Sequence, residues 1–327
     1  MKLLRLTLDN YRGAPDGAYS FTHPATGAPL DTVYVTGPAA SGKTTFLEAI
    51  GALKESVAAW DLPPDPARLL RKGARSGKVE GTWLLTAEEA ELAESREREV
   101  TTTLELGQDA PPSLAEAGLR ALFGRYSHDP ATGKFEYFPS NRRLLRGPGD
   151  KPPPVFREAG MRLVAHPDKY GFLQRALIDL ALSDGVKTLE EATEKGVLLR
   201  SDTRDSLAPY RRDMAELTPN IRLLGVEAGE RGPELVFERR DGAHLSLDDL
   251  ADSEKQAFLF AVTFRRVGLS RSIVLVDQPE LHWHTDAQLR FARSLGKLGA
   301  DNQIFFATGS PEVTRTAASH EIIRLGA

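Results

Sequence analysis

The 327-residue sequence contains no cysteine and no long apolar run. Without cysteine, both disulfide bonds and thiolate metal sites are excluded. No segment approaches the roughly 20 apolar residues that a membrane-spanning helix needs. The first residues, MKLLRLTLDNYRG, alternate apolar and polar side chains as a strand does, which is not the pattern of a signal peptide. We therefore expect a cytoplasmic protein with no membrane contact.

The sequence also lacks a marked excess of one charge. It has 42 basic and 46 acidic residues and thus a net charge of -4. A surface that binds nucleic acid would therefore have to be a local basic patch. Hydrophobic residues make up 41% and charged residues 27% of the chain, an ordinary balance for a soluble globular protein. The length allows one large domain or two modest ones.

The order of predicted elements favours a parallel sheet covered by helices on both faces. In the carboxyl-terminal third, helices at 253–267, 286–298 and 311–318 alternate with strands at 273–276, 303–307 and 321–325. Earlier strands are predicted at 3–8, 32–36, 79–86, 99–106, 134–138, 221–226 and 234–238. Helices are predicted at 43–57 and at 113–126, where Ser113 is the N-cap, and residues 169–217 are mostly helical.

Residues 37–44, GPAASGKT, fit the phosphate-binding pattern G-x-x-x-x-G-K-[ST] at every fixed position. Its glycines let backbone N–H groups turn inward, and the start of the following helix adds partial positive charge. We expect Lys43 to reach the β- and γ-phosphates of ATP, Thr44 to bind Mg²⁺, and Thr45 to support the α-phosphate. The predicted nucleotide-binding residues of this turn are Gly37, Pro38, Ala39, Ala40, Ser41, Gly42, Lys43, Thr44 and Thr45.

Asp277 is the second candidate ligand for Mg²⁺. It follows the apolar strand predicted at 273–276, which we expect to lie beside the strand that precedes the phosphate turn. A turn or helix-capping aspartate is the alternative for this residue taken alone. The phosphate turn favours the metal role.

Five further segments resemble one family. LADSEKQ (250–256) resembles the ABC signature, DQPELHWH (277–284) resembles the strand end DEPELHLHP of RecF-like and OLD-like ATPases, and ATGSPEV (307–313) resembles their switch-histidine segment. YFPSNRRL (137–144) resembles their Y-x-P-x-x-R segment, and LDNYRG (8–13) resembles the N-[FY]-R element of SMC and RecF ATPases. The chain thus resembles a compact, stand-alone ABC-type ATPase head of the SMC/RecF/OLD superfamily.

This resemblance implies an α/β P-loop NTPase with a mostly parallel core sheet, an antiparallel β subdomain and a helical lobe. The two parts of the head would be residues 1–145 and 221–327, separated by a helical lobe or insertion at 146–220. The short segment after Asp277 leaves no room for the topoisomerase-primase nuclease domain of OLD proteins. The middle segment is too broken by proline and glycine for the long coiled coil of SMC proteins.

The resemblance also implies a homodimer in which two heads enclose two ATP molecules. Ser253 would then face the γ-phosphate bound by the partner, and Arg12 would contact the nucleotide. The segment containing His282 would lie near the dimer interface. The implied activity is ATP hydrolysis, with Lys43 among the catalytic residues.

Departures from the family pattern bear on turnover. Gln278 replaces the catalytic glutamate, Gly309 stands in place of the switch histidine, and Ala251 and Ser253 replace the usual serine and glycine of the signature. A glutamine orients water but takes no proton, and a loss of this kind costs about a hundredfold to ten-thousandfold in rate. Gln278 is either natural, which would make the protein an ATP-dependent switch, or an engineered exchange that traps the ATP-bound dimer.

Alternative water-handling groups are Glu280, His282 and His284. The predicted catalytic set is Gln278, Lys43, Glu280 and His282. Two classes of function stay open. The first is an ATPase switch in DNA repair or anti-phage defence that works with a separately encoded effector. The second is an ATP-dependent regulator or scaffold with little turnover and no DNA contact. The inserted middle segment disfavours a membrane-transporter subunit.

Clusters of basic residues are candidates for contact with DNA phosphates or with an acidic partner. Their alternatives are a solvated face or ion pairs within the protein. The residues are Arg142, Arg143, Arg146, Lys151 and Arg157, and in a second group Arg200, Arg204, Arg211 and Arg212.

Overall fold

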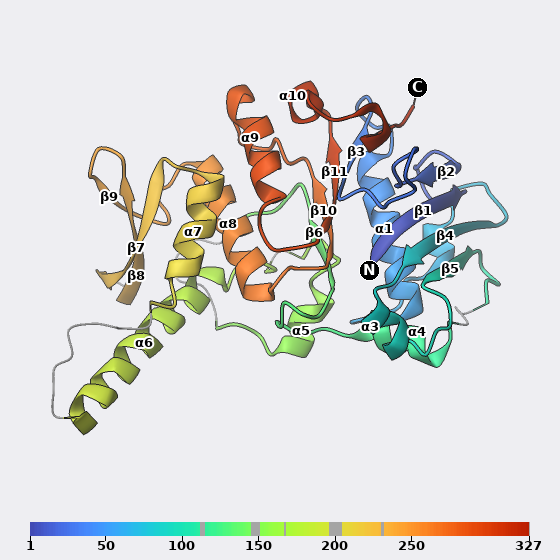
Figure 1. The fold of residues 1–327 in the computed structure, drawn as a ribbon. Helices are drawn as coiled ribbons and strands as arrows, with labels where there is room; N and C mark the ends of the chain where they lie inside the picture. The colour runs from blue at the N-terminus through green and yellow to red at the C-terminus, as the bar shows by residue number, and fades with distance from the viewer. Residues whose placement is uncertain (112–114, 145–150, 167, 196–204, 230–231, 327) are drawn as a thin grey trace. The chain divides into compact units, whose positions relative to one another are not determined.

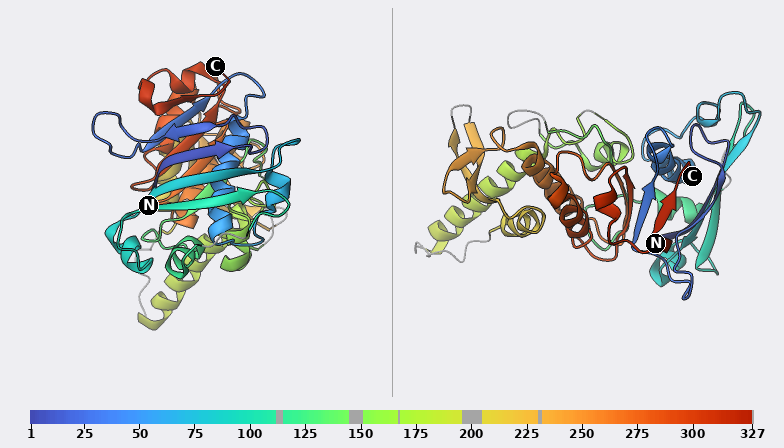
Figure 2. Two further views of the ribbon diagram at one scale, coloured as in Figure 1. Left: turned by 90° about the vertical axis from the view of Figure 1, so that its right-hand side faces the viewer. Right: turned by 90° about the horizontal axis from the view of Figure 1, so that it is seen from above.

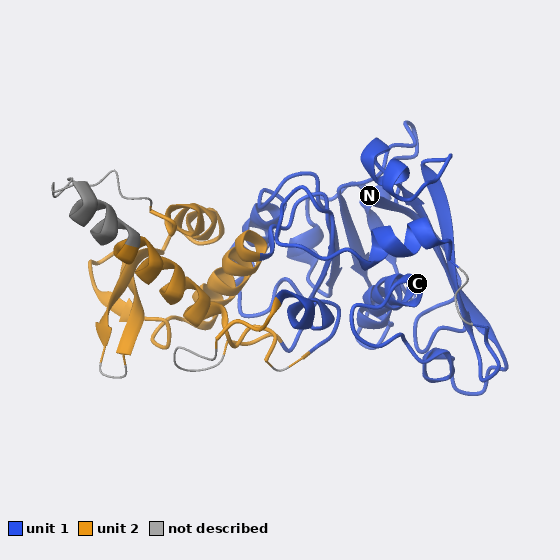
Figure 3. Ribbon diagram, turned by 90° about the horizontal axis from the view of Figure 1, so that it is seen from below, with its two compact units in different colours: residues 1–141, 155–165, 267–327 blue, residues 142–154, 166–266 orange. Residues whose placement is uncertain are grey.

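The computed structural model describes residues 1–111, 115–144, 151–166, 168–195, 205–229 and 232–326. The chain forms two compact units (Figure 3). Unit 1 comprises residues 1–141, 155–165 and 267–327, and unit 2 comprises residues 142–154 and 166–266. The division at residues 145 and 220 that the family resemblance implies stays a prediction.

A five-stranded parallel sheet lies at the centre of unit 1 (Figure 1), in the order β12-β3-β11-β10-β6. Its strands are β3 (Thr32–Thr36), β6 (Phe135–Phe138), β10 (Ile273–Asp277), β11 (Gln303–Thr308) and β12 (Ile322–Arg324). β6, β10 and β11 are buried along their whole length, which suits a parallel sheet covered on both faces. The predicted fold class is confirmed.

One expectation about this sheet is wrong. β10 does not lie beside β3, because β11 pairs with both of them and separates them. Since all three strands are parallel, their carboxyl ends still meet at one edge of the sheet. Thr36 of β3 is paired with Thr308 of β11, and Ala307 of β11 is paired with Asp277 of β10. The intervening strand therefore still allows the phosphate turn and Asp277 to approach each other.

A four-stranded antiparallel sheet forms a second layer of unit 1, in the order β2-β1-β4-β5. Its strands are β1 (Lys2–Asp9), β2 (Gly17–Ser20), β4 (Gly77–Leu84) and β5 (Glu99–Leu106). Helix α1 (Lys43–Val57) lies between the two sheets (Figure 2) and contacts β10 and β11 on one side and β4 and β5 on the other. Eight of its fifteen residues are buried, which explains its apolar sequence.

The two sheets share one hydrophobic core. Phe21 packs edge-to-face against Phe46 of α1 and Phe305 of β11, and Trp83 packs against Phe135 of β6. Such aromatic contacts stabilise a core beyond the area that they bury. The core therefore holds α1 and the strands that end near the phosphate turn in a fixed arrangement.

The remaining elements of unit 1 are short or peripheral. They are α2 (Pro66–Leu69), α3 (Ala87–Leu92), α4 (Ala117–Gly124), α5 (Val155–Gly160), α9 (Thr285–Leu295), α10 (Pro311–Thr314) and the 3₁₀ helix η1 (Ser319–Glu321). The helices predicted at 113–126, 286–298 and 311–318 all exist, but each is shorter than predicted. The predicted N-cap Ser113 lies outside the described residues.

The described residues of unit 2 form three helices and a three-stranded antiparallel sheet. Its elements are α6 (Leu173–Lys195), α7 (Ala208–Leu217), β7 (Ile221–Gly229), β8 (Gly232–Arg239), β9 (His244–Ser246) and α8 (Asp252–Val267), whose last residue belongs to unit 1. Phe237 of β8 packs on Phe258 of α8, and Asp213 of α7 forms a bidentate ion pair with Arg265. No helix in the described parts of the chain has the length and apolar character to cross a membrane.

The structure corrects part of the predicted basic surface. Arg142 is 3% exposed, its Nε donates to Gln256 Oε1 at 2.7 Å, and its guanidinium lies over the ring of Phe260. Arg211 is half-buried and bonds to the carbonyl oxygens of Leu223 and Leu224. Both arginines make their contacts within unit 2, as the alternative of interactions within the protein predicts, and contact of the basic clusters with DNA stays a prediction. Arg146, Arg200 and Arg204 lie outside the described residues.

Candidate nucleotide site

The phosphate turn has the backbone that its sequence predicts. It connects β3 to α1, and Gly42, the N-cap of α1, has a φ of 93°. A Cβ on Gly42 would lie 2.7 Å from the carbonyl oxygen of Gly13, and a Cβ on Gly37 would lie 2.5 Å from Ser41 Oγ. Only glycine fits both positions, because any larger residue would collide with its neighbours. Between these glycines, Pro38, Ala39 and Ala40 are exposed.

Lys43 lies across the turn. Its Nζ donates to the carbonyl oxygens of Gly37 at 2.8 Å and Pro38 at 2.7 Å. Helix α1 has no acidic residue in its first turn, so no carboxylate there competes for its positive end. An ammonium group and the start of a helix thus lie together at a glycine-rich turn, which is the arrangement that binds anions.

Thr44 and Asp277 meet although 233 positions separate them in sequence. Thr44 Oγ1 donates to Asp277 Oδ2 at 2.9 Å, and Asp277 is only 1% exposed. A hydroxyl and a carboxylate are oxygen ligands of the kind that Mg²⁺ prefers. The donor set therefore fits a magnesium ion that also binds substrate phosphates. Within the described residues, no group of three or more His, Cys, Asp or Glu side chains could hold a metal ion.

Arg12 contacts a residue of α1 that the sequence motifs do not indicate. Its guanidinium donates to Glu48 Oε2 at 2.9 Å. Glu48 follows Thr44 by one turn of α1, so their spacing alone places both on the same face of the helix. Burial raises the pKa of Glu48, Arg12 opposes that shift, and the charge of Asp277 adds to it. The i,i+4 spacing from Thr44 is the signal that could have identified Glu48.

The segment after Asp277 is a tight turn. Gln278 is exposed, its φ is 51°, and its backbone N–H donates to the carbonyl oxygen of Ala307 at 2.8 Å. His282 is also exposed and has a φ of 68°, whereas the neighbouring Trp283 is buried and stacks on Phe291. The turn therefore presents the amide of Gln278 at the same strand edge as the phosphate turn.

Glu280 joins this turn to the end of β11. Its Oε2 accepts from Thr308 Oγ1 at 2.8 Å, and its Oε1 accepts from the backbone N–H of Gly309 at 3.0 Å. Ser310 continues the network, since its N–H donates to Thr308 Oγ1 at 2.9 Å. The carboxylate of Glu280 is thus engaged in fixing the loop that carries Gly309, a contact that the sequence did not predict.

Ser253 belongs to unit 2 and not to this cluster in unit 1. It lies in the first turn of α8 between two acidic residues, Asp252 and Glu254. Glu254 Oε2 accepts from the backbone N–H of Ala251 at 2.9 Å and so caps the start of the helix. The helix start that resembles the ABC signature therefore carries negative side chains.

Comparisons with known proteins agree with the fold. Residues 164–315 match the family model described as an AAA domain, putative AbiEii toxin, Type IV TA system. Among solved structures, an SMC head bound to the C-winged helix domain of ScpA matches with a TM-score of 0.53 and 15% identity, covering 99% of this chain and 94% of that one. No curated protein has significant sequence similarity to the chain.

An SMC head domain from Thermotoga maritima has a TM-score of 0.47 and 15% identity, over 96% of this chain and 92% of that one. At such identities, the likeness to solved SMC heads concerns the fold. The first match spans nearly the whole of both chains, and the AAA-domain match covers much of the carboxyl-terminal half. Together they show that the chain has the fold of an SMC head and that residues 164–315 are similar to an AAA domain.

Proposed function

We propose that the chain binds ATP with Mg²⁺ at residues 37–45 and acts as a slow ATPase switch. The observation that carries this proposal is the 2.9 Å contact between Thr44 Oγ1 and Asp277 Oδ2 beside the phosphate turn. A chance glycine-rich turn would have no reason to lie against a buried aspartate from a distant strand. The contact therefore supports a phosphate and metal site.

Different residues of the site are proposed to bind the phosphates and the metal ion. The backbone N–H groups around Gly42 would hold phosphate oxygens, and Lys43 would exchange its bonds to two loop carbonyls for bonds to the β- and γ-phosphates. Thr44 and Asp277 would hold Mg²⁺. The positive charge held there would offset the negative charge of the phosphates.

Gln278 limits the ability of the site to activate water for hydrolysis. Its exposed amide would orient a water molecule by hydrogen bonding, but it would not accept the proton. Glu280 is the first carboxylate after Gln278 in sequence, and both of its oxygens accept hydrogen bonds from the loop of Thr308 and Gly309. Slow hydrolysis is therefore proposed, because the amide of Gln278 stands where the family has its catalytic base.

Two heads are proposed to form a homodimer around ATP, with Ser253 of one head near the γ-phosphate bound by the other. The backbone N–H groups at the start of α8 would supply this contact. Two observations on similar proteins support a switch with an effector: the SMC-head structure contains a domain of ScpA, and the matching family model is described as a putative toxin of a toxin–antitoxin system. A separately encoded effector in DNA repair or anti-phage defence is the proposed partner.

The alternative is a regulator or scaffold with little turnover and no DNA contact. Packing of Arg142 and Arg211 within unit 2 favours it, since two of the candidate DNA contacts are used internally. ATP-dependent DNA binding that weakens steeply with salt would favour the DNA-related switch. The absence of such binding, together with ATP-driven dimerisation, would favour the scaffold.

Titration of the protein with ATP in the presence of Mg²⁺ tests the proposal. We expect saturable binding that Lys43→Ala weakens strongly and that Asp277→Ala makes insensitive to Mg²⁺. Thermal unfolding of each variant without nucleotide is the control for folding. Undetectable binding of ATP or GTP by the folded wild-type protein would contradict the proposal.

A further inference from the structure

The loop that carries Arg12 adopts an unusual backbone. Asn10 and Arg12 have φ angles of 53° and 40°. Residues other than glycine adopt this left-handed conformation only where the surrounding structure holds them there. Tyr11, between them, is 1% exposed and forms an isolated β-bridge with Leu70. The loop is therefore held by contacts with the segment after α2.

Arg71 supplies most of these contacts. Its Nε donates to the carbonyl oxygen of Arg12 at 2.9 Å, and its Nη2 donates to that of Ala14 at 2.5 Å. Two bonds of 2.8 Å join its Nη1 and Nη2 to the carboxylate of Asp16, whose Oδ1 also accepts from the backbone N–H of Asn10. The hydrogen bond from Arg71 lowers the pKa of Asp16, which favours the charged form of the pair.

The loop held by Arg71 lies directly against the phosphate turn. A Cβ on Gly42 would lie 2.7 Å from the carbonyl oxygen of Gly13 and 3.0 Å from the Cα of Ala14. From the same loop, Arg12 reaches Glu48 on α1. A displacement of residues 10–16 would therefore disturb the N-cap of α1 and the side chain of Arg12 together.

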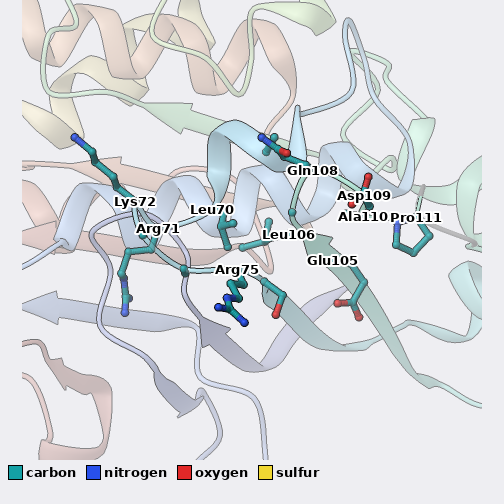
Figure 4. A pocket seen from close by; sticks show the side chains of 15 residues that line it. Leu70, Arg71, Lys72, Arg75, Glu105, Leu106, Gln108, Asp109, Ala110 and Pro111 are labelled. Carbon is teal, nitrogen blue, oxygen red and sulfur yellow. The ribbon is translucent and has the colours of Figure 1, made fainter.

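Arg71 also lines a pocket of about 660 Å³ between the loop after α2 and the end of β5. Lys72 and Arg75 line the same pocket, and both are exposed. Figure 4 shows the side chains of Arg71 and Lys72 directed away from each other. Two adjacent basic residues thus have different surroundings, since Arg71 binds the loop of Arg12 and Lys72 extends from the opposite side.

We propose that Arg71 is a positioning residue of the nucleotide site, which it serves by holding residues 10–16 against Gly42 and in reach of Glu48. The inference rests on the proposed nucleotide function. An exposed ion pair alone contributes little to folding. The effect of Arg71 should therefore appear in nucleotide affinity more than in stability.

Arg71→Ala, Arg71→Lys and Asp16→Asn test this role, with Lys72→Ala as the matched control from the same loop. The measurements are the dissociation constant of ATP-Mg²⁺ and the thermal midpoint without nucleotide. We expect Arg71→Ala to weaken binding about tenfold. Arg71→Lys should be intermediate, because lysine keeps the charge but lacks the fork that binds a carboxylate and two carbonyls. Asp16→Asn should weaken binding in the same direction, and Lys72→Ala should bind as the wild type does.

The outcomes separate this inference from the proposed function. Wild-type affinity in folded Arg71→Ala, or an equal loss in Lys72→Ala, overturns the inference and leaves the nucleotide function intact. If the wild type binds no nucleotide, the proposed function fails, and amide hydrogen exchange of the unliganded proteins decides the inference. Faster exchange at residues 10–16 and 37–45 in Arg71→Ala would support it, and unchanged exchange would overturn it.

Discussion

Gln278 combines an exposed side chain with a backbone held in place. Its N–H bonds to Ala307, and its φ of 51° fixes the direction in which the side chain leaves the strand. A glutamate has almost the same shape as glutamine, so it would occupy this position without changing the backbone. The difference between the two lies in the ability to accept a proton.

Gln278→Glu is therefore expected to raise the rate of ATP hydrolysis by about a hundredfold or more, with ATP affinity unchanged. Steady-state phosphate release and equilibrium nucleotide binding measure the two quantities separately. Gln278→Ala is the control, because it removes the amide without adding a base. Equal turnover of the Gln and Glu versions would show that this position does not limit hydrolysis.

Lys134 is a buried cation next to β6. It is 2% exposed, and its Nζ donates to the carbonyl oxygens of Asp129, Val267 and Gly268 at 2.9 to 3.0 Å. Burial lowers the pKa of Lys134 from 10.5 to about 8. The unfolded chain therefore holds more protons than the folded one between about pH 8 and pH 10.5.

Stability should consequently rise with pH across that window, at up to about 1.4 kcal/mol per pH unit from this group. Below pH 8 the contribution is constant, because Lys134 is then protonated in both states. Denaturant unfolding at several pH values measures the slope, and Lys134→Met should reduce it. A side-chain NMR titration that placed the pKa of Lys134 near 10.5 would contradict this account.

At the scale of elements, sequence patterns predict the helices and strands whose formation depends on residues close together in the chain. The strand–turn–helix of residues 32–57 was predicted with its correct bounds, because its glycines and its apolar spacing are properties of the segment itself. β2, β9, α2 and α5 were missed, since they are only three to six residues long and depend on distant partners. Strand adjacency was likewise beyond the sequence, which carries no signal that β11 separates β3 from β10.

The residues of the candidate site likewise fall into those that sequence motifs predict and those that only the structure reveals. Lys43, Thr44 and Asp277 belong to recognisable motifs, and the structure brings them together. Arg71 acts on main-chain carbonyl oxygens of a loop far away in sequence, so no pattern of residue types indicates it. The contact of Glu280 with Gly309 likewise depends on the packing of two strand ends.

Gln303 connects two elements through contacts that no sequence motif predicts. It is fully buried in β11, its Oε1 accepts from the backbone N–H of Leu3, and its Nε2 donates to the carbonyl oxygens of Leu3 and Leu30. It therefore joins the antiparallel sheet to the parallel one.

Gln303→Leu should lower the free energy of unfolding by about 3 kcal/mol, because several buried backbone groups would lose their partners. Chemical denaturation measures the loss. Gln288→Leu on α9 is a comparison outside the sheets. A loss at Gln303 no larger than that at Gln288 would show that the link is not needed to join the two layers.

For the whole molecule, the proposed switch depends on whether ATP joins two heads. The first turn of α8 carries Asp252 and Glu254 beside Ser253. Carboxylates in the first turn of a helix stabilise the helix through its dipole, but they repel a phosphate that approaches the same end. The ATP-driven dimer should therefore be weaker than that of a head with glycine at position 252. Slow hydrolysis caused by Gln278 would offset this weakness, because it would prolong the lifetime of the ATP-bound dimer.

Light scattering with and without ATP and Mg²⁺ should show a monomer that becomes a dimer only with nucleotide. Asp252→Asn should tighten the dimer about two- to fivefold, since it removes one opposing charge next to the γ-phosphate. Lys43→Ala is the control that should stay monomeric. If Asp252→Asn leaves the dimer constant unchanged while ATP still joins the wild-type heads, the start of α8 does not face the phosphate, and the contact between heads must be sought on another surface.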